Sequence, residues 1–303
     1  GIGLFHKDAR YSRRLSVPPR ARVNSVRHLV RGLWLVFLCG GLSGPADAEL
    51  QTLSRLGLEI RALEKRHDAR IGVMVRHPAF GWYGDHRLCA AILYQVDRQV
   101  LDLNTKIKIS GQDILHYAPV TKKHIGSALP ISDLCFATLD QSDNTAANLL
   151  INLLGGPKGV MTYLDRINDA VTRLDRIEPS LNDFVAGDPR DTTSPAAMTA
   201  TWQKVLTGDA LRPTSRAQLA EWMRHGSVTQ EFLRKYAPVG WQIIDKSGGG
   251  RNHTRSIVAM VTPLAAAPYF VAIYVSDTPA SWVERNAIVA EIGRAIIDII
   301  TAR

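Results

Sequence analysis

The order of β-like and helical segments is the feature that most constrains the fold of this 303-residue chain. Three consecutive segments rich in β-branched and aromatic residues, separated by turn residues, are GWQIIDKSG (240–248), RSIVAMVTP (255–263) and YFVAIYVSD (269–277). A similar run, RIGVMVRH (70–77), comes early, and helical patterns at 50–67 and 282–303 flank the set. Strands joined by short turns pair antiparallel. The pattern therefore predicts an α+β fold, an antiparallel sheet flanked by terminal helices in an α/β/α sandwich.

The middle of the chain predicts a second, all-helical lobe. The segment LCAAILYQVDRQVL (88–101) is apolar nearly all round, which indicates a deeply buried helix. Further helical patterns lie at 131–143, 145–154, 159–169, 194–206 and 215–226. The last two open with Ser194 and Ser215, and serine is suited to the helix N-cap. We expect residues 49–77 and 225–303 to form an α/β domain and residues 78–224 a helical domain, with the site in the cleft between them.

Residues 23–48 have the three parts of a secretory signal peptide. Arg27 and Arg31 precede an apolar stretch at 33–42, and small residues end the segment at 46–48. We interpret residues 1–22 as an upstream extension. The apolar stretch is too short to span a bilayer, so we expect no stable membrane anchor. The protein is predicted to be periplasmic or secreted.

The charge balance argues against a nucleic-acid partner. The formal net charge is +9, but residues 1–48 carry eight Lys or Arg and two acidic residues, which leaves +3 for the rest of the chain. No basic stripe with interleaved aromatic residues is visible, so we expect no nucleic-acid binding. The nine histidines show no ligand-like spacing with Cys, Asp or Glu, so we expect no metal site.

Two cysteines, Cys89 and Cys135, remain once the predicted signal peptide is removed. An oxidising compartment favours one disulfide between them, and two separate buried thiols are the alternative.

Three motifs together carry a family resemblance. They are SDN (142–144), KSG (246–248) and the segment RLDRIEPSLNDFVAGDPRDTTSP (173–195). Each of the two short motifs is common in turns and strand ends, but their order and spacing match penicillin-recognising serine enzymes. With ARIGVMV, YAPVTKKHIG and ERNAIVAEIG also in the family's order, the chain resembles the class A serine β-lactamases over nearly its whole mature length.

This resemblance implies a β-lactamase/transpeptidase-like fold and a specific activity. The activity is hydrolysis of the β-lactam amide bond of penicillins and cephalosporins, which gives antibiotic resistance. It runs through acylation of a serine and deacylation by a water that a glutamate activates. The resemblance also implies a monomer that needs no cofactor.

The resemblance gives roles to four residues of the loop at 175–191, which matches the family's omega loop. Glu178 matches the deacylation base, and Asn182 matches its partner in holding the hydrolytic water. Arg176 and Asp191 match the ion pair that fixes the ends of the loop. Without the resemblance, Glu178 would be read as a solvated loop glutamate, and Arg176 and Asp191 as two exposed charges that contribute little.

Five more residues match groups that handle the substrate. Ser142 matches the hydroxyl that passes a proton to the lactam nitrogen, and Asn144 matches an amide that binds the substrate's acylamide. Lys246 matches the cation that attracts the substrate carboxylate. Ser247 and Arg255 match further donors to that carboxylate, which an arginine can bind in a bidentate way.

Three other correspondences complete the site. Gly249 matches a backbone N–H of the oxyanion hole, and Tyr117 matches an aromatic wall of the cleft. Cys89 and Cys135 match the positions of a disulfide found in some members. From the residues alone, Ser142 reads equally as a helix cap and Tyr117 as a core tyrosine.

The Ser-x-x-Lys motif that supplies the family's nucleophile is absent. No serine in the chain has a lysine three residues later. Counted back from Cys89, the family's frame falls on Trp82, Tyr83, Gly84 and Asp85. Counted forward from ARIGVMV, the chain is about 15 residues shorter than the family spacing. The sequence therefore predicts a site whose nucleophile is absent.

Two explanations for this segment stay open. Residues 76–88 are either an out-of-frame stretch, which resequencing codons 70–92 would test, or the mark of a pseudoenzyme. Such a pseudoenzyme would bind β-lactams or peptidoglycan fragments without hydrolysing them. A penicillin-binding transpeptidase is a third hypothesis, and Glu178 argues against it because transpeptidases lack a dedicated deacylation base.

Overall fold

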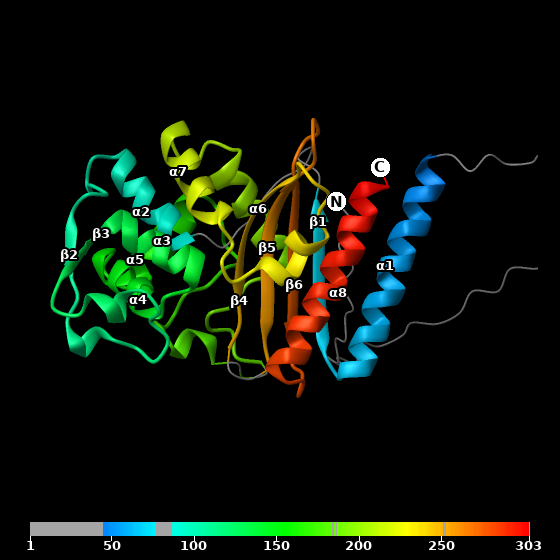
Figure 1. The fold of residues 1–303 in the computed structure, drawn as a ribbon, viewed down its shortest axis with the longest axis horizontal. Coiled ribbons are helices and arrows are strands. Elements are labelled where there is room, and N and C mark those ends of the chain that lie inside the picture. Colours follow the sequence, from blue (N-terminus) through cyan, green and yellow to red (C-terminus); the bar gives the residue numbers. More distant parts are fainter. Residues whose placement is uncertain (1–44, 77–86, 184, 186, 251–252, 303) are drawn as a thin grey trace, which may run out of the picture.

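The computed structural model describes residues 45–76, 87–183, 185, 187–250 and 253–302. It contains a four-stranded antiparallel sheet in the order β1-β6-β5-β4 (Figure 1). The strands are β1 (Arg70–Arg76), β4 (Gln242–Gly248), β5 (Arg255–Thr262) and β6 (Tyr269–Ser276). The predicted strands and their antiparallel pairing are therefore confirmed. The predicted signal peptide, apart from residues 45–48, and the frame at 82–85 lie outside the described residues.

Two helices cover one face of the sheet, α1 (Pro45–His67) and α8 (Trp282–Thr301) (Figure 1). The helix α8 begins with a capping box, because the Ser281 side chain accepts from the Glu284 N–H and the Glu284 carboxylate accepts from the Ser281 N–H. The helix α1 begins five residues before the pattern predicted. The buried residues of this layer include Leu56, Ile60, Leu63, Ile257, Ile273, Ile288, Ile292 and Ile296.

Helices also cover the opposite face, which confirms the sandwich. The helix α6 (Pro195–Leu206) contacts β1 and β6, and it begins at a cap in which the Ser194 hydroxyl accepts from the Ala197 N–H at 2.8 Å. Beyond it lies a helical lobe (Figure 1). Its helices are α2 (Arg87–Asp97), α3 (Ile131–Gln141), α4 (Asn144–Leu153), α5 (Pro157–Arg166) and α7 (Pro213–Arg224).

The prediction that Ser215 is the N-cap of a helix is wrong. The helix α7 starts two residues earlier, at Pro213, with Arg212 at the N-cap and no side-chain cap bond. The Ser215 hydroxyl instead donates to the Asp97 carboxylate at 2.6 Å, and that carboxylate also accepts from the Arg212 N–H at 2.8 Å. The start of α7 is thus held by a side chain of α2, a partner 118 residues away in sequence.

The central helix of the lobe is shorter than predicted. The helix α2 ends at Asp97, but its residues 89–93 are all buried, as its apolar sequence indicates. The sequence did not predict a small ribbon formed by β2 (Lys106–Lys108) and β3 (Ala128–Pro130). It also missed the short helical turns at Gly111–Asp113, Thr121–His124, Ser180–Asn182 and Gln230–Arg234. No helix in the described ranges combines the length and apolar character that spanning a membrane requires.

The strand β4 contributes Asp245 to a buried ion pair with Arg234. The Asp245 carboxylate, on a side chain that is 0% exposed, accepts from Nε and Nη2 of Arg234 at 2.9 Å and from the Thr229 hydroxyl at 2.8 Å. Burial raises the pKa of Asp245, whereas the Arg234 guanidinium opposes that rise. Removing the arginine would leave a buried charge without its partner.

We predict that Arg234→Ala lowers the free energy of unfolding by about 3–5 kcal/mol, because the Asp245 carboxylate loses its compensating charge. Urea unfolding followed by circular dichroism measures the change. The control is Lys235→Ala, which removes an exposed i,i+4 pair with Glu231 and should leave stability nearly unchanged. Equal losses in the two variants would contradict this role of the buried pair.

Candidate active site

The turn between α3 and α4 presents the SDN motif. Ser142 ends α3 in the left-handed conformation, with φ 55° and ψ 41°, which is uncommon for a residue other than glycine. Its backbone N–H donates to the carbonyls of Ala137 and Thr138, so the serine is the C-cap of α3. Asp143 follows as the N-cap of α4, its side chain accepting from the Ala146 N–H. The motif therefore joins two helices and leaves the Ser142 side chain half-buried at the turn.

Asp143 holds this turn in place. Its carboxylate is fully buried and accepts from the Ala146 and Val120 N–H groups at 2.9 Å and from the Thr121 N–H and hydroxyl at 2.8 Å. Each bond satisfies a charge that would otherwise be costly to bury. The sequence alone indicated no role for Asp143, although its place inside the motif was a signal that could have indicated one.

Lys246 links the two lobes at the motif. Its Nζ donates to the Ser142 Oγ at 2.5 Å and to the Ser247 carbonyl oxygen at 2.6 Å. Lys246 lies on β4 and Ser142 at the end of α3, 104 residues away. The structure thus brings the two short motifs together, as their matching order in the family leads one to expect.

An ion pair closes the loop at 175–191. The Arg176 Nε donates to the Asp191 carboxylate at 2.5 Å, and the side chain of Asp191 is only 4% exposed. The same carboxylate accepts from the N–H groups of Asp175 and Arg176 at 2.7 and 3.0 Å. In return, the Asp175 carboxylate accepts from the Asp191 N–H at 3.0 Å. The two ends of the loop are therefore fixed to each other.

Glu178 is held at both its side chain and its backbone. The Asn182 Nδ2 donates to the Glu178 Oε2 at 2.7 Å. The Asn148 amide on α4 accepts from the Glu178 N–H at 2.8 Å and donates to the Glu178 carbonyl at 2.9 Å. Asn148 could not be predicted from the sequence, because nothing in the pattern of α4 indicates that this amide contacts a loop 30 residues later.

Burial sets the protonation of Glu178. It raises the pKa of this carboxyl to about 7, against the nearby charge of Lys246 and the hydrogen bond from Asn182, which both lower it. The charge of Asp191 adds a smaller upward shift. A carboxylate with a pKa close to neutral pH is suited to accept a proton from water.

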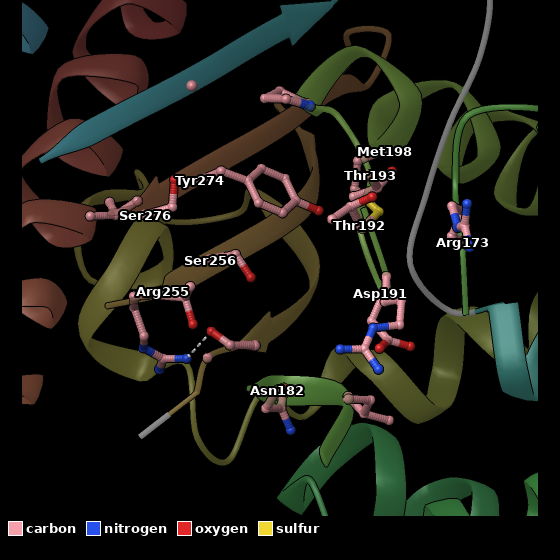
Figure 2. Close-up of a pocket in the computed structure, with 18 of the residues that line it drawn as sticks. Arg173, Asn182, Asp191, Thr192, Thr193, Met198, Arg255, Ser256, Tyr274 and Ser276 are labelled. Carbon is pink, nitrogen blue, oxygen red and sulfur yellow. Dashed lines mark hydrogen bonds between the residues drawn. The ribbon is translucent and has the colours of Figure 1, made fainter. Parts of the chain in front are cut away.

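A cavity of about 1050 Å³ lies between this loop and the sheet (Figure 2). The residues around it that bear on the site are Glu178, Asn182, Gly248, Gly249, Arg255, Ser256 and Tyr274. Figure 2 shows the Tyr274 hydroxyl directed from the sheet toward Thr192 and Thr193 at the end of the loop. In the part of the chain that the structure describes, Ser142, Asn144, Lys246, Ser247 and Tyr117 do not line this cavity. The cavity is therefore lined by the part of the site that includes the loop. Lys246 lies outside its lining, but the charge of Lys246 lowers the pKa of Glu178.

Arg255 is buried and held on several sides. Its Nε donates to the Asn286 amide oxygen at 2.7 Å and its Nη1 donates to the Gly248 carbonyl at 2.8 Å. Its guanidinium also stacks on the rings of Trp282 and Phe232, at 4.6 and 4.9 Å from their centroids. Burial lowers the pKa of Arg255 to about 10, so the group stays cationic at neutral pH.

The residues that follow β4 are closely packed, and Gly250 approaches the loop so closely that it has no room for a side chain. A Cβ at Gly249 would meet atoms of Arg255, Thr254 and Trp282 at 3.1 Å. A Cβ at Gly250 would stand 2.2 Å from the Asn182 carbonyl oxygen. Glycine is therefore required where the strand end meets the residue that holds Glu178. The sequence alone indicated no role for Gly250.

Tyr117 contacts Asn144, the last residue of the SDN motif. The Asn144 N–H donates to the Tyr117 carbonyl at 3.1 Å, and the Tyr117 residue is 47% exposed. Tyr117 is thus not a core tyrosine, the alternative that its sequence left open.

Cys89 and Cys135 are free thiols in this structure, and both are fully buried. The Cys89 Sγ donates to the Cys135 carbonyl at 3.8 Å. Burial raises the pKa of the Cys135 thiol well above its usual value, and its contact with the Cys89 thiol adds to this. The expected disulfide is therefore not formed here, although the two thiols adjoin.

Comparisons with known proteins agree on one group. The profile of the Beta-lactamase enzyme family matches residues 87–300, so the match begins at the end of the segment 76–88, where the resemblance is lost. The chain is 41% identical over 270 residues to a beta-lactamase from Rhodobacter capsulatus, covering 84% of this chain and 89% of that protein. It is 40% identical over 259 residues to beta-lactamase CARB-3 from Pseudomonas aeruginosa, covering 81% and 90%.

The match to the Rhodobacter capsulatus protein also bears on length. The alignment is 270 positions long, but it includes only 84% of the 303 residues of this chain, which is about 255. At about 15 aligned positions, this chain therefore has no residue opposite the relative. This difference is similar to the shortfall that the family spacing indicates.

Solved structures give the same result. A beta lactamase from Xanthomonas campestris pv. campestris superposes with a TM-score of 0.78 at 36% identity, covering 82% of this chain and 98% of that one. The ancestral (GNCA) class A beta-lactamase superposes with a TM-score of 0.76 at 40% identity, covering 80% and 99%.

The raised pKa of Glu178 predicts a pH-dependent cost to stability. The folded state keeps the proton up to about pH 7, whereas the unfolded chain loses it near 4.5, so stability falls as pH rises between these values. We predict that Glu178→Gln, which is neutral and can still accept from Asn182, is more stable than the unmodified chain by about 3 kcal/mol near pH 8 and by less than about 1 kcal/mol near pH 5.

Urea unfolding at the two pH values measures this difference. The control is Glu221→Gln on α7, whose carboxylate is 57% exposed and should give no such pH-dependent gain. A gain for Glu178→Gln that is equal at both pH values would show that burial of the charge is not its cause.

Proposed function

The chain belongs to the beta-lactamase enzyme family, and from this membership we propose that its site binds β-lactams between the loop at 175–191 and β4. The family places it among hydrolases that act on β-lactams. The observation that carries the proposal is the Glu178–Asn182 pair, in which a half-buried carboxylate of pKa about 7 lies beside an amide that could help to orient a water molecule.

The anchoring half of the proposed site is cationic. Lys246 and Arg255 would attract the carboxylate of a β-lactam, with the Ser247 hydroxyl as a further donor. Asn144 would bind the acylamide side chain of the substrate, and Tyr117 would form a wall of the cleft. The Gly249 N–H would stabilise negative charge on the lactam carbonyl oxygen.

The deacylation half would act on water. Glu178 would remove a proton from a water molecule that Asn182 helps to orient, and the ion pair of Arg176 and Asp191 keeps the loop folded around both. This half of the reaction needs an acyl group to release.

The acylation half lacks its usual residues. The family's serine and lysine have no counterpart in the sequence, since no Ser-x-x-Lys occurs in it. Loss of a nucleophile typically lowers kcat by about 10⁶-fold. We therefore propose that this chain binds β-lactams and hydrolyses them far more slowly than family members that have the Ser-x-x-Lys motif. The same proposal includes three further properties: the protein is exported to the periplasm or secreted, residues 175–191 form an omega loop, and the protein is a monomer.

We predict that the purified chain hydrolyses a chromogenic cephalosporin about 10⁶-fold more slowly than the Rhodobacter capsulatus relative measured beside it. Isothermal titration calorimetry with the same compound should still show saturable binding, which Lys246→Ala weakens through loss of the cation. Hydrolysis within tenfold of the relative would contradict the loss of the acylating pair, and an absence of binding would contradict the proposed site.

We propose that Cys89 and Cys135 form a disulfide in the exported protein, since the two thiols adjoin and the compartment is oxidising. We predict that protein recovered from the periplasm has no thiol that reacts with Ellman's reagent after unfolding, and two after reduction. The matched control is Cys135→Ala, which should show one reactive thiol without reduction. Two reactive thiols in unreduced protein would contradict the disulfide.

A further inference from the structure

The buried cation of the proposed site is surrounded by aromatic rings rather than by a carboxylate. We propose that Trp282 and Phe232 are positioning residues for Arg255, and that their rings keep its guanidinium buried and unpaired, so that it selects β-lactams with a free carboxylate. This inference rests on the proposed function, because it requires a β-lactam in the cavity that Arg255 lines. It gives a role in specificity to two residues that the family resemblance did not single out.

Arg255 has no counter-charge among its contacts. The residue is 6% exposed, and its hydrogen bonds go to two neutral acceptors, the Asn286 amide oxygen and the Gly248 carbonyl. Across the described residues, no carboxylate forms an ion pair with it, and the neighbouring charge that affects its pKa is another cation, Arg285. Burying a cation without a counter-charge is costly, so other groups must offset this cost.

The two rings offset part of that cost. The Arg255 guanidinium carbon lies 4.6 Å from the centroid of Trp282 and 4.9 Å from that of Phe232. At such distances the face of an aromatic ring attracts a cation although the ring carries no net charge. A carboxylate in the same place would form an ion pair with the guanidinium and occupy its donors. The rings therefore stabilise the cation and leave it available to an anionic ligand.

The planar shape of the guanidinium separates these two kinds of contact. Its N–H bonds lie in the plane of the group, whereas aromatic rings stack on its faces, so the rings do not compete for the donors. The Nε and Nη1 atoms of Arg255 make the two hydrogen bonds to Asn286 and Gly248, and Nη2 takes part in neither. A substrate carboxylate can therefore accept from Nη2 without displacing either bond.

Trp282 is itself held in place. It is the first residue of α8, directly after the residue that forms the capping box. The guanidinium of Arg285, one turn later, stacks on the same ring at 5.4 Å and donates to the Thr254 carbonyl at 2.7 Å. The ring also reaches the Gly249 backbone, since a Cβ built there would stand 3.1 Å from its Cζ3 atom. The indole is thus fixed between the start of α8 and the segment that precedes Arg255.

The rings act on the substrate through Arg255 and not by contact. Within the described ranges, Trp282 and Phe232 do not line the cavity of about 1050 Å³ beside Glu178. They line a separate cavity of about 790 Å³, and Arg255 lines both. A change at Trp282 should therefore alter recognition of the group that Arg255 binds and leave the other substrate contacts in place.

Isothermal titration calorimetry with benzylpenicillin and with its methyl ester tests the proposal. The ester lacks the negative charge, so the ratio of the two dissociation constants measures the preference for a free carboxylate. We expect the unmodified chain to prefer the acid, and Trp282→Leu to reduce this preference by about 5- to 30-fold, the range of a desolvated cation–π contact. The loss should come from weaker binding of the acid, whereas a merely structural role would weaken binding of both compounds.

Two further variants separate the ring from its volume. Trp282→Phe keeps an aromatic face and should retain most of the preference. Trp282→Glu places a carboxylate beside Arg255, and we expect the resulting ion pair to abolish the preference. In an Arg255→Gln background, Trp282→Leu should have no further effect, because the cation that the ring positions is gone.

The control is Val283→Ala, which changes the next residue of α8, is 75% exposed and should leave both dissociation constants unchanged. Three results would overturn this inference and leave β-lactam binding standing: no preference in the unmodified chain, equal weakening of acid and ester by Trp282→Leu, or the full effect of Trp282→Leu in the Arg255→Gln background. Failure of the unmodified chain to bind either compound would contradict the proposed function instead. If Trp282→Leu does not fold, Trp282→Glu decides, and a preference retained in that variant would overturn the inference.

Discussion

The ion pair between Arg176 and Asp191 is the constraint on which the site depends. This pair joins the two ends of the loop that carries Glu178, so it sets where the loop leaves and rejoins the rest of the chain. The Asp191 carboxylate is nearly buried and accepts hydrogen bonds from three donors. The ion pair therefore stabilises the fold more than an exposed surface ion pair would. With the loop closed, Glu178 is buried enough for its pKa to approach 7.

The backbone of Glu178 needs a second attachment, and the helical lobe supplies it. The Asn148 amide bonds both the N–H and the carbonyl of Glu178, so the carboxylate is positioned relative to α4. The other lobe reaches the same place through Lys246, which bonds Ser142 at the end of α3. The site thus depends on contacts between α3, α4, the loop and β4, and it can persist without the residues that normally start the reaction.

The sequence predicted the sheet and most helices because these follow from local pattern. Residues 89–93 are apolar on every side, and that alone indicates a buried helix. Ser194 and Ser215 show the limit of such reasoning. Both precede apolar helical patterns, but only Ser194 caps a helix, because Ser215 is engaged by Asp97 from far away in the chain. Asp143 and Asn148 were missed for the same reason, since their partners are backbone groups of distant segments. The roles proposed for the substrate-binding residues came from the family resemblance, and the structure supplies their positions.

The central claim is that the chain keeps the anchoring and deacylating parts of a β-lactamase and lacks only the pair that performs fast acylation. The most direct test replaces residues 76–88 with a segment of family length that carries Ser-x-x-Lys, and compares kcat for a chromogenic cephalosporin before and after. The account predicts a gain of several orders of magnitude, up to about 10⁶-fold, that is lost again on Glu178→Gln. A chimera that folds and binds the substrate but gains no activity would contradict it.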